Sequence, residues 1–273
     1  MLPTPTGWFP DPWNNTAVRF WDGRAWTGYV AVPAPAPRLP HPTLPRRAAW
    51  GAVVTLLASL TASRYLLKAI SGFEWPIAVY VFIIALVGYG PALSWCWYAS
   101  RRWGSGRFRS DVGLSARWAD AGWGPITWGA CLVMQVVVAV VLVVLKIPFT
   151  SNIRRVSDLH ADRGYVISLL ALAVVAAPIA EEIVFRGVVL RGLLSRDGPV
   201  MAVGVQGVLF GLAHFDPVRG AGNIGLILVL SSVGCVLGGA AYLFRRLAPT
   251  MIAHAMINGL AMALALSGWL SSR

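Results

Sequence analysis

The sequence predicts an all-α polytopic membrane bundle of about seven transmembrane helices, with a small β-type appendage at its N-terminus. Of the 273 residues, 57% are hydrophobic and only 12% are charged, whereas soluble domains are about 25% charged. Apolar runs recur from residue 48 to the C-terminus, and a membrane span needs about 20 such residues. An aromatic-rich segment and a proline-rich stretch precede these runs.

The N-terminal appendage is predicted to be a small tryptophan-rich domain formed by residues 1–30. Asp22-Gly23 lies between two aromatic-rich runs, and this dipeptide favours a tight hairpin turn. The segment resembles a short domain of unknown function that recurs at the ends of actinobacterial membrane proteins. We expect either a docking module at the membrane interface or a passive appendage. Residues 31–47 alternate proline with alanine and leucine, which predicts an extended, semi-rigid linker.

The membrane domain is predicted to occupy residues 48–273. The fifth of its apolar runs is short and the fourth is long, so we expect both to be tilted or partly re-entrant. The predicted spans are residues 48–70, 75–98, 123–145, 165–194, 200–215, 224–244 and 248–270.

The formal net charge is +12, and almost all of it comes from arginine. The arginines lie between apolar runs, as the positive-inside rule expects, whereas a nucleic-acid-binding protein would gather them on one polar face. We therefore expect the lipid bilayer and no nucleic acid as a partner. The pattern and the arginine and alanine bias predict a multi-pass protein of a bacterial plasma membrane with a cytoplasmic N-terminus. Arg154, Arg155 and Arg163 fall on the opposite side.

The fourth predicted span contains the first cluster of charged residues. An ionisable side chain inside a bilayer costs on the order of 3 kcal/mol, so it is a functional candidate by default. Glu181 and Glu182 point about 100° apart on a helix and cannot face the same spot. Glu182 and Arg186 have the spacing of an ion pair, which leaves Glu181 to face elsewhere. The alternative is a network that only stabilises the helix end.

Two further clusters lie on the fifth and seventh spans. Phe210 and His214 lie near the end of the fifth span. His254 and Asn258 are four residues apart, which places them on one helix face. Taken singly, the histidines and the asparagine fit ordinary polar contacts between helices. Together with the carboxylates they supply a base, a second proton-handling group and oxyanion donors. That combination suits the attack of water on an amide.

The three clusters also resemble the motifs of a known family. EExxxR, FxxxH and HxxxN occur in that order, within the flanks APIAEEIVFRG and VLFGLAH. This pattern is similar to the CPBP family of intramembrane proteases, which includes the CAAX prenyl endopeptidases and the bacterial Abi proteins linked to bacteriocin immunity. The resemblance covers residues 165–273.

The resemblance implies a role for each motif residue. Glu181 would activate water with His214 beside it, and His254 and Asn258 would stabilise the oxyanion. Three further residues would shape the site, namely Glu182, Arg186 and Phe210.

The sequence leaves two mechanisms open. Glu181, His214 and His254 could offer one carboxylate and two imidazoles to a divalent metal such as catalytic zinc. The zincin pattern HExxH does not occur, and a metal-free glutamate mechanism is the preferred expectation.

The leading hypothesis is an intramembrane endopeptidase similar to a CAAX prenyl endopeptidase. Its peptide or protein substrate would reach the site from the membrane or the cytoplasm. The first alternative is a non-enzymatic membrane immunity or scaffolding protein that keeps the pocket only for binding. The second is a small transporter or channel that uses the buried carboxylates as a proton relay, although no paired half-helices or repeats support it.

Overall fold

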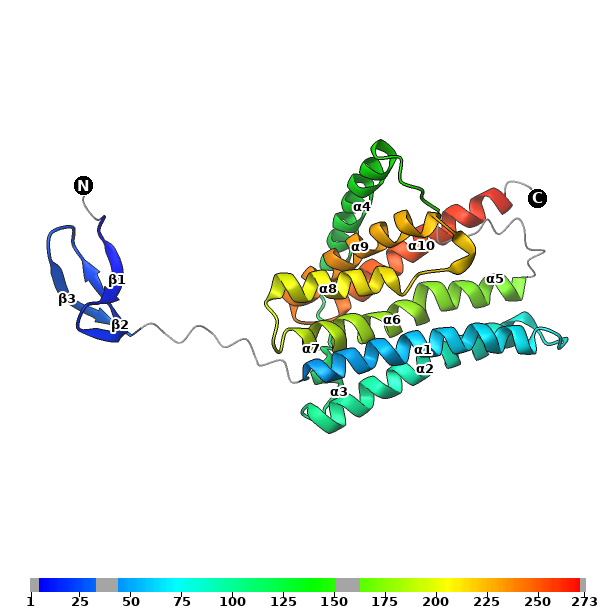
Figure 1. The fold of residues 1–273 in the computed structure, drawn as a ribbon, viewed down its shortest axis with the longest axis horizontal. Helices are drawn as coiled ribbons and strands as arrows, with labels where there is room; N and C mark the ends of the chain where they lie inside the picture. The colour runs from blue at the N-terminus through cyan, green and yellow to red at the C-terminus, as the bar shows by residue number, and fades with distance from the viewer. Residues whose placement is uncertain (1–4, 33–43, 151–162, 271–273) are drawn as a thin grey trace. The chain divides into compact units, whose positions relative to one another are not determined.

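The computed structural model describes residues 5–32, 44–150 and 163–270 (Figure 1). The chain forms two compact units, Met1–His41 and Pro42–Arg273. Most of the predicted linker falls on residues 33–43, outside the described residues, and so do Arg154 and Arg155.

The first unit is a three-stranded antiparallel sheet with the strand order β1-β2-β3. Its strands are β1 (Gly7–Asp11), β2 (Asn14–Trp21) and β3 (Trp26–Ala31). The predicted turn joins β2 to β3, and Gly23 there has a φ of 95°, which glycine adopts without strain. The rings of Trp21 and Trp26 meet edge to face at 5.3 Å across the turn. The small β-type appendage is therefore confirmed.

The second unit is a helical bundle that confirms the predicted polytopic fold. Six helices in the described residues are long and apolar enough to cross a membrane. The helix at the predicted fifth span has 14 residues, so it is about 21 Å long and shorter than the 30 Å hydrocarbon core. The helices are α1 (Arg46–Ile70), α2 (Ile77–Trp103), α3 (Phe108–Val112), α4 (Asp120–Val144), a composite helix (Arg163–Leu193), α8 (Pro199–Leu212), α9 (Gly222–Phe244) and α10 (Ala248–Leu270).

Several helix boundaries differ by a few residues from the sequence-based spans, and those of α1 and α2 have a common cause. α1 begins at Arg46, two residues inside the predicted linker, and α2 continues to Trp103. Both extensions contain arginine, which ends a hydropathy run but is a good helix former. The short helix α3 lies between the second and third predicted spans, in a stretch for which no helix was predicted.

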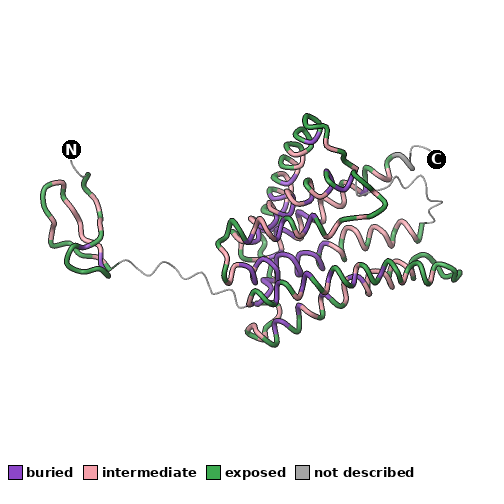
Figure 2. Tube along the Cα trace, viewed as in Figure 1, coloured by how far each residue is buried: buried purple, intermediate pink, exposed green. Residues whose placement is uncertain are grey.

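The composite helix lies between α1 and α8 (Figure 1). Its parts are α5 (Arg163–Leu170), η2 (Ala171–Ala176), α6 (Ala177–Glu182), η3 (Ile183–Leu190) and α7 (Arg191–Leu193). η2 and η3 are π-helical, and such segments often occur at functional sites. All eight residues of η3 are buried, and Figure 2 shows this stretch within the most buried part of the bundle.

α8 and α9 cross at glycines that allow their backbones to touch. A Cβ atom at Gly207 would lie 2.9 Å from the backbone nitrogen of Cys235, and one at Gly211 would lie 2.6 Å from the carbonyl oxygen of Ile227. Gly207 and Gly211 have the small-xxx-small spacing of closely packed membrane helices. Because His214 follows α8, this crossing fixes where its side chain lies.

One end of the bundle gathers a cluster of arginines. Arg246 donates a 2.8 Å hydrogen bond to Asp120, and Arg191 donates one of 2.9 Å to the carbonyl of Arg245. This arginine-rich end is where α1 begins, where α2 and α9 end and where the composite helix ends (Figure 1), and the arginines at those helix ends are Arg46, Arg47, Arg101, Arg102, Arg191, Arg196, Arg245 and Arg246. Arg163 lies at the opposite end, where the composite helix begins (Figure 1).

Candidate active site

Glu181 on α6 lies where three other helices meet. Its Oε1 atom accepts a 2.6 Å hydrogen bond from the hydroxyl of Tyr89 on α2. Its Oε2 atom lies 3.7 Å from Nε2 of His254 and 3.9 Å from Nε2 of His214. Both distances exceed a direct hydrogen bond. One carboxylate oxygen is thus held, and the other faces two imidazoles.

One hydrogen bond of His214 shows which of its two ring nitrogens carries the hydrogen. Its Nδ1 atom lies 2.8 Å from the carbonyl oxygen of Phe210. A carbonyl oxygen only accepts hydrogen bonds, so Nδ1 carries the hydrogen. In the neutral ring the Nε2 atom facing Glu181 then has a lone pair.

Glu182 anchors a second, fully buried group. Its Oε1 atom accepts hydrogen bonds of 2.9 Å from Nη1 of Arg186 and 2.9 Å from Nδ1 of His254. The ion pair expected between Glu182 and Arg186 is present, and both side chains are 0% exposed. An ionised carboxylate is acceptor-only, so Nδ1 of His254 also carries a hydrogen and its Nε2 faces Glu181.

Arg186 is fixed by more than its ion pair. Its Nη2 atom donates to the carbonyl of Gly234 at 3.3 Å, and its guanidinium lies 4.4 Å from the ring centroid of Phe210. The same carbonyl accepts a 2.8 Å hydrogen bond from Gln206. Gln206 is fully buried and was not identified from the sequence.

Phe210 packs against both histidines. The centroid of its ring lies 4.9 Å from that of His214 and 5.6 Å from that of His254. It also meets Phe185 edge to face at 5.2 Å. The two imidazoles are therefore held by packing as well as by their Nδ1 hydrogen bonds.

Asn258 lies one turn after His254 but makes a different contact. Its Nδ2 atom donates a 2.8 Å hydrogen bond to the carbonyl of Ala173 in η2. Within the described residues no hydrogen bond joins Asn258 to Glu181, His214 or His254. Its predicted role as an oxyanion donor therefore depends on the second hydrogen of the same amide.

Tyr89 is a contact of the candidate base that the sequence analysis missed. It lies between Gly88 and Gly90, just before Pro91 in the middle of α2. A phenol flanked by glycines in an apolar span is a weak signal, because a buried tyrosine hydroxyl usually finds some partner. Only the fold shows that this partner is Glu181.

The donors around Glu181 match a metal site in type but not in spacing. Its Oε2 atom is buried and has no hydrogen-bond partner in the described part of the chain. Both histidines donate Nδ1–H to an oxygen, as zinc ligands do. However, ligands of a tetrahedral zinc lie about 3.4 Å apart, and no group of three acidic, histidine or cysteine side chains in the described ranges has metal-binding spacing. We therefore derive no step through a metal.

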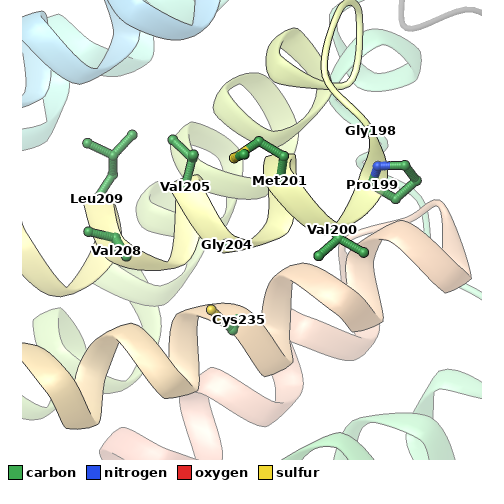
Figure 3. A pocket seen from close by; sticks show the side chains of 9 residues that line it. All are labelled: Gly198, Pro199, Val200, Met201, Gly204, Val205, Val208, Leu209 and Cys235. Atoms are coloured by element: carbon green, nitrogen blue, oxygen red, sulfur yellow. The ribbon is translucent and has the colours of Figure 1, made fainter.

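An apolar pocket lies apart from these residues, along α8 and α9 (Figure 3). Its volume is about 780 Å³, and its lining includes Met201, Val205, Leu209 and Cys235. None of the candidate site residues lines it. The pocket is a feature of the apolar surface of the bundle and supplies no base or oxyanion donor.

Comparisons with known proteins identify two regions of the chain. Residues 6–39 match the family described as Protein of unknown function (DUF2510). Residues 163–260 match the family described as Type II CAAX prenyl endopeptidase Rce1-like. No curated protein and no solved structure matches the chain. The chain is therefore a multi-pass membrane protein whose residues 163–260 are similar to the Rce1-like CAAX prenyl endopeptidases, in agreement with its resemblance to the CPBP proteases.

Proposed function

We propose that this protein is an intramembrane endopeptidase that hydrolyses peptide bonds, with Glu181 as the general base. The observation that carries the proposal is the convergence of Glu181 Oε2 with Nε2 of His214 and Nε2 of His254, at 3.9 Å and 3.7 Å. A carboxylate and two imidazoles around one point provide the groups that amide hydrolysis needs.

The first step is the activation of a water molecule. Atoms 3.9 Å apart are too distant to bond directly, but one water placed about 2.8 Å from each can donate one hydrogen to Glu181 and the other to His214. The water oxygen then presents a lone pair to the scissile carbonyl. As it attacks, Glu181 takes its proton and a tetrahedral oxyanion forms.

His254 is proposed as the oxyanion donor. Its Nδ1–H is bonded to Glu182, so it can donate from Nε2 only as an imidazolium. Two carboxylates and one guanidinium give the cluster a charge of −1, and a proton on His254 makes it neutral. Neutrality reduces the cost of placing these groups in apolar surroundings. The second N–H of Asn258 is the other proposed donor.

Collapse of the tetrahedral intermediate completes the reaction. The proton held by Glu181 passes to the nitrogen of the breaking C–N bond, which leaves as an amine. The acyl part leaves as a carboxylic acid, and the carboxylate of Glu181 is restored. The hydroxyl group of the water is therefore in the acid product, and its other hydrogen is in the amine product.

The proposed location follows from the arginines. If the arginine-rich end faces the cytoplasm, as the positive-inside rule indicates, then the N-terminal unit is cytoplasmic. The bias towards arginine and alanine leads us to propose a bacterial plasma membrane. The family description makes a peptide that follows a prenylated cysteine the first substrate class to test.

The test compares two carboxylate variants in liposomes. Glu181→Gln removes the proposed base, whereas Glu74→Gln makes the same change at an exposed position between α1 and α2. The probes are peptides ending in a CAAX sequence, with and without a farnesyl group on the cysteine. We expect Glu181→Gln to reduce cleavage about 10²–10⁴-fold and Glu74→Gln to leave it unchanged. Equal cleavage by wild type and Glu181→Gln would remove the assignment and favour a binding role.

A further inference from the structure

A second, basic pocket lies at the arginine-rich end of the bundle. It is formed where α1 begins, where α2 ends and where the chain leaves α7. Its volume is about 360 Å³, which is within the range of small-ligand sites. The lining is Leu44, Pro45, Arg46, Arg47, Trp103, Ser195 and Arg196.

The charge of this pocket is unbalanced. Arg46 lies 3.3 Å from the carboxylate of Asp197. The guanidinium of Arg47 lies 4.8 Å from the ring centroid of Trp103. In the described part of the chain neither Arg47 nor Arg196 pairs with a carboxylate. Three arginines and one aspartate therefore leave a charge of about +2 around the pocket.

This arrangement suits a phosphate group. Guanidinium groups bind phosphate through two parallel hydrogen bonds. The pocket also lies at the first turn of α1, whose N-terminus has no side-chain cap, so its backbone N–H groups add to the positive potential. These features favour an anion with several oxygens over a single carboxylate.

The surroundings favour a lipid as the source of the phosphate. Trp103 is the last residue of α2, and tryptophan is enriched at the membrane–water interface, so we place this end of α2 there. From that level an exposed apolar stripe runs along α1 through Trp50, Val54 and Leu57, which are spaced along one helix face. A headgroup in the pocket would leave its acyl chains beside this stripe.

We propose that this pocket binds the phosphate of an anionic glycerophospholipid headgroup. The inference does not depend on peptide hydrolysis, because the pocket shares no residue with the candidate active site. Its function would be to hold the start of α1 against the end of α7 at the surface of an anionic membrane.

The test measures lipid binding to the full-length protein by native mass spectrometry. The probes are short-chain phosphatidylglycerol and phosphatidylcholine, with inorganic phosphate as a competitor. Arg47→Gln combined with Arg196→Gln should weaken phosphatidylglycerol binding about 25-fold, or fivefold for each arginine. Binding of phosphatidylcholine should not change. Arg46 is kept because it also pairs with Asp197.

The matched control is Arg101→Gln combined with Arg102→Gln. Arg101 also stacks on a tryptophan, 5.3 Å from the ring centroid of Trp97, at the same end but outside the pocket. This control should weaken phosphatidylglycerol binding less than about threefold, which is less than one pocket arginine contributes. If the double pocket variant fails to fold, each single variant is measured, with about a fivefold loss expected.

The competitor separates the two sources of phosphate. Displacement of the lipid by inorganic phosphate at matched concentration would support a site for free phosphate, and resistance to displacement would support the headgroup. The proposal is overturned if the pocket variant and the control lose binding equally. It is also overturned if the wild type binds phosphatidylcholine as tightly as phosphatidylglycerol.

Discussion

Tyr89 donates its hydroxyl hydrogen to Oε1 of Glu181 at 2.6 Å, although the two residues are 92 positions apart in the chain. The bond engages one carboxylate oxygen and turns the other towards His214 and His254. Tyr89 lies outside residues 163–260, so the matched family region alone does not contain every contact of the candidate base.

We predict that Tyr89→Phe lowers kcat without a comparable change in KM. A hydrogen bond to a charged group contributes about 1.5–3 kcal/mol, which corresponds to about 10- to 100-fold in rate. Steady-state cleavage of any peptide that the wild type accepts provides the measurement. Tyr80→Phe is the control, because Tyr80 lies on the same helix and bonds the carbonyls of Ile70 and Phe73 instead. An unchanged kcat for Tyr89→Phe would show that the bond does not orient Glu181.

We predict that Arg186→Met destabilises the bundle by about 3–5 kcal/mol, because it leaves the buried Glu182 without its guanidinium partner. The apparent Tm in detergent should fall well below that of the wild type. Arg102→Met serves as the control, since Arg102 is exposed. Similar Tm values for the two variants would contradict a stabilising role for the buried pair.

We predict that Gly207→Ala destabilises the crossing of α8 and α9. The added Cβ would lie 2.4 Å from Sγ of Cys235, and overpacking of this kind costs about 1–3 kcal/mol. Cleavage should fall together with the Tm, because His214 moves with the end of α8. At Gly204, on the same helix, a Cβ meets nothing within 4 Å. Gly204→Ala should therefore leave both the cleavage rate and the Tm unchanged. Equal behaviour of the two variants would argue against the close crossing.

We predict that the N-terminal sheet loses stability in acid. The backbone N–H of Trp13 and the guanidinium of Arg19 lower the pKa of Asp11 in the folded sheet. The stabilisation is therefore complete above the ordinary aspartate pKa of about 3.9 and is lost as the pH falls through the lower folded value. Hydrogen exchange of residues 7–31, corrected for intrinsic rates, should show this loss. Asp11→Asn should remove the pH dependence. If the pH dependence persists in this variant, a group other than Asp11 causes it.

We predict that the purified protein cleaves peptides without stoichiometric zinc. Metal analysis after mild chelation and cleavage before and after it provide the measurement. One zinc per chain that is retained by the wild type and lost in His214→Gln would contradict the metal-free mechanism. Loss of cleavage on chelation, with recovery on addition of zinc, would contradict it as well.

The helices could be predicted from the sequence because the length of an apolar run is enough to identify a membrane span. All seven apolar runs correspond to helices, and the short fifth run is the short helix α8. The ion pair between Glu182 and Arg186 was also predictable, since both residues lie on one helix. Asp22-Gly23 located the hairpin for a similar reason, because the turn depends on neighbouring residues only.

The contacts of the candidate site were less predictable because they join distant helices. Nothing in the local pattern connects Tyr89 to Glu181, or Asn258 to a carbonyl in η2. The spacing of His254 and Asn258 correctly indicated a shared helix face, but it did not indicate which partner each side chain would find. The boundaries of α1 and α2 differed because charged residues end a hydropathy signal without ending a helix.

The shortness of α8 has a consequence for the loop that follows it. A helix of about 21 Å that begins at the arginine-rich end stops inside the hydrocarbon layer, and the chain from His214 to Gly220 continues without regular α-helix. Irregular backbone at such a depth requires protein contacts or a water-filled cavity. Protein contacts meet part of this requirement, because the side chain of Asn223 bonds both the N–H and the carbonyl of Asp216. The length of one helix therefore places a self-satisfied polar loop directly after His214.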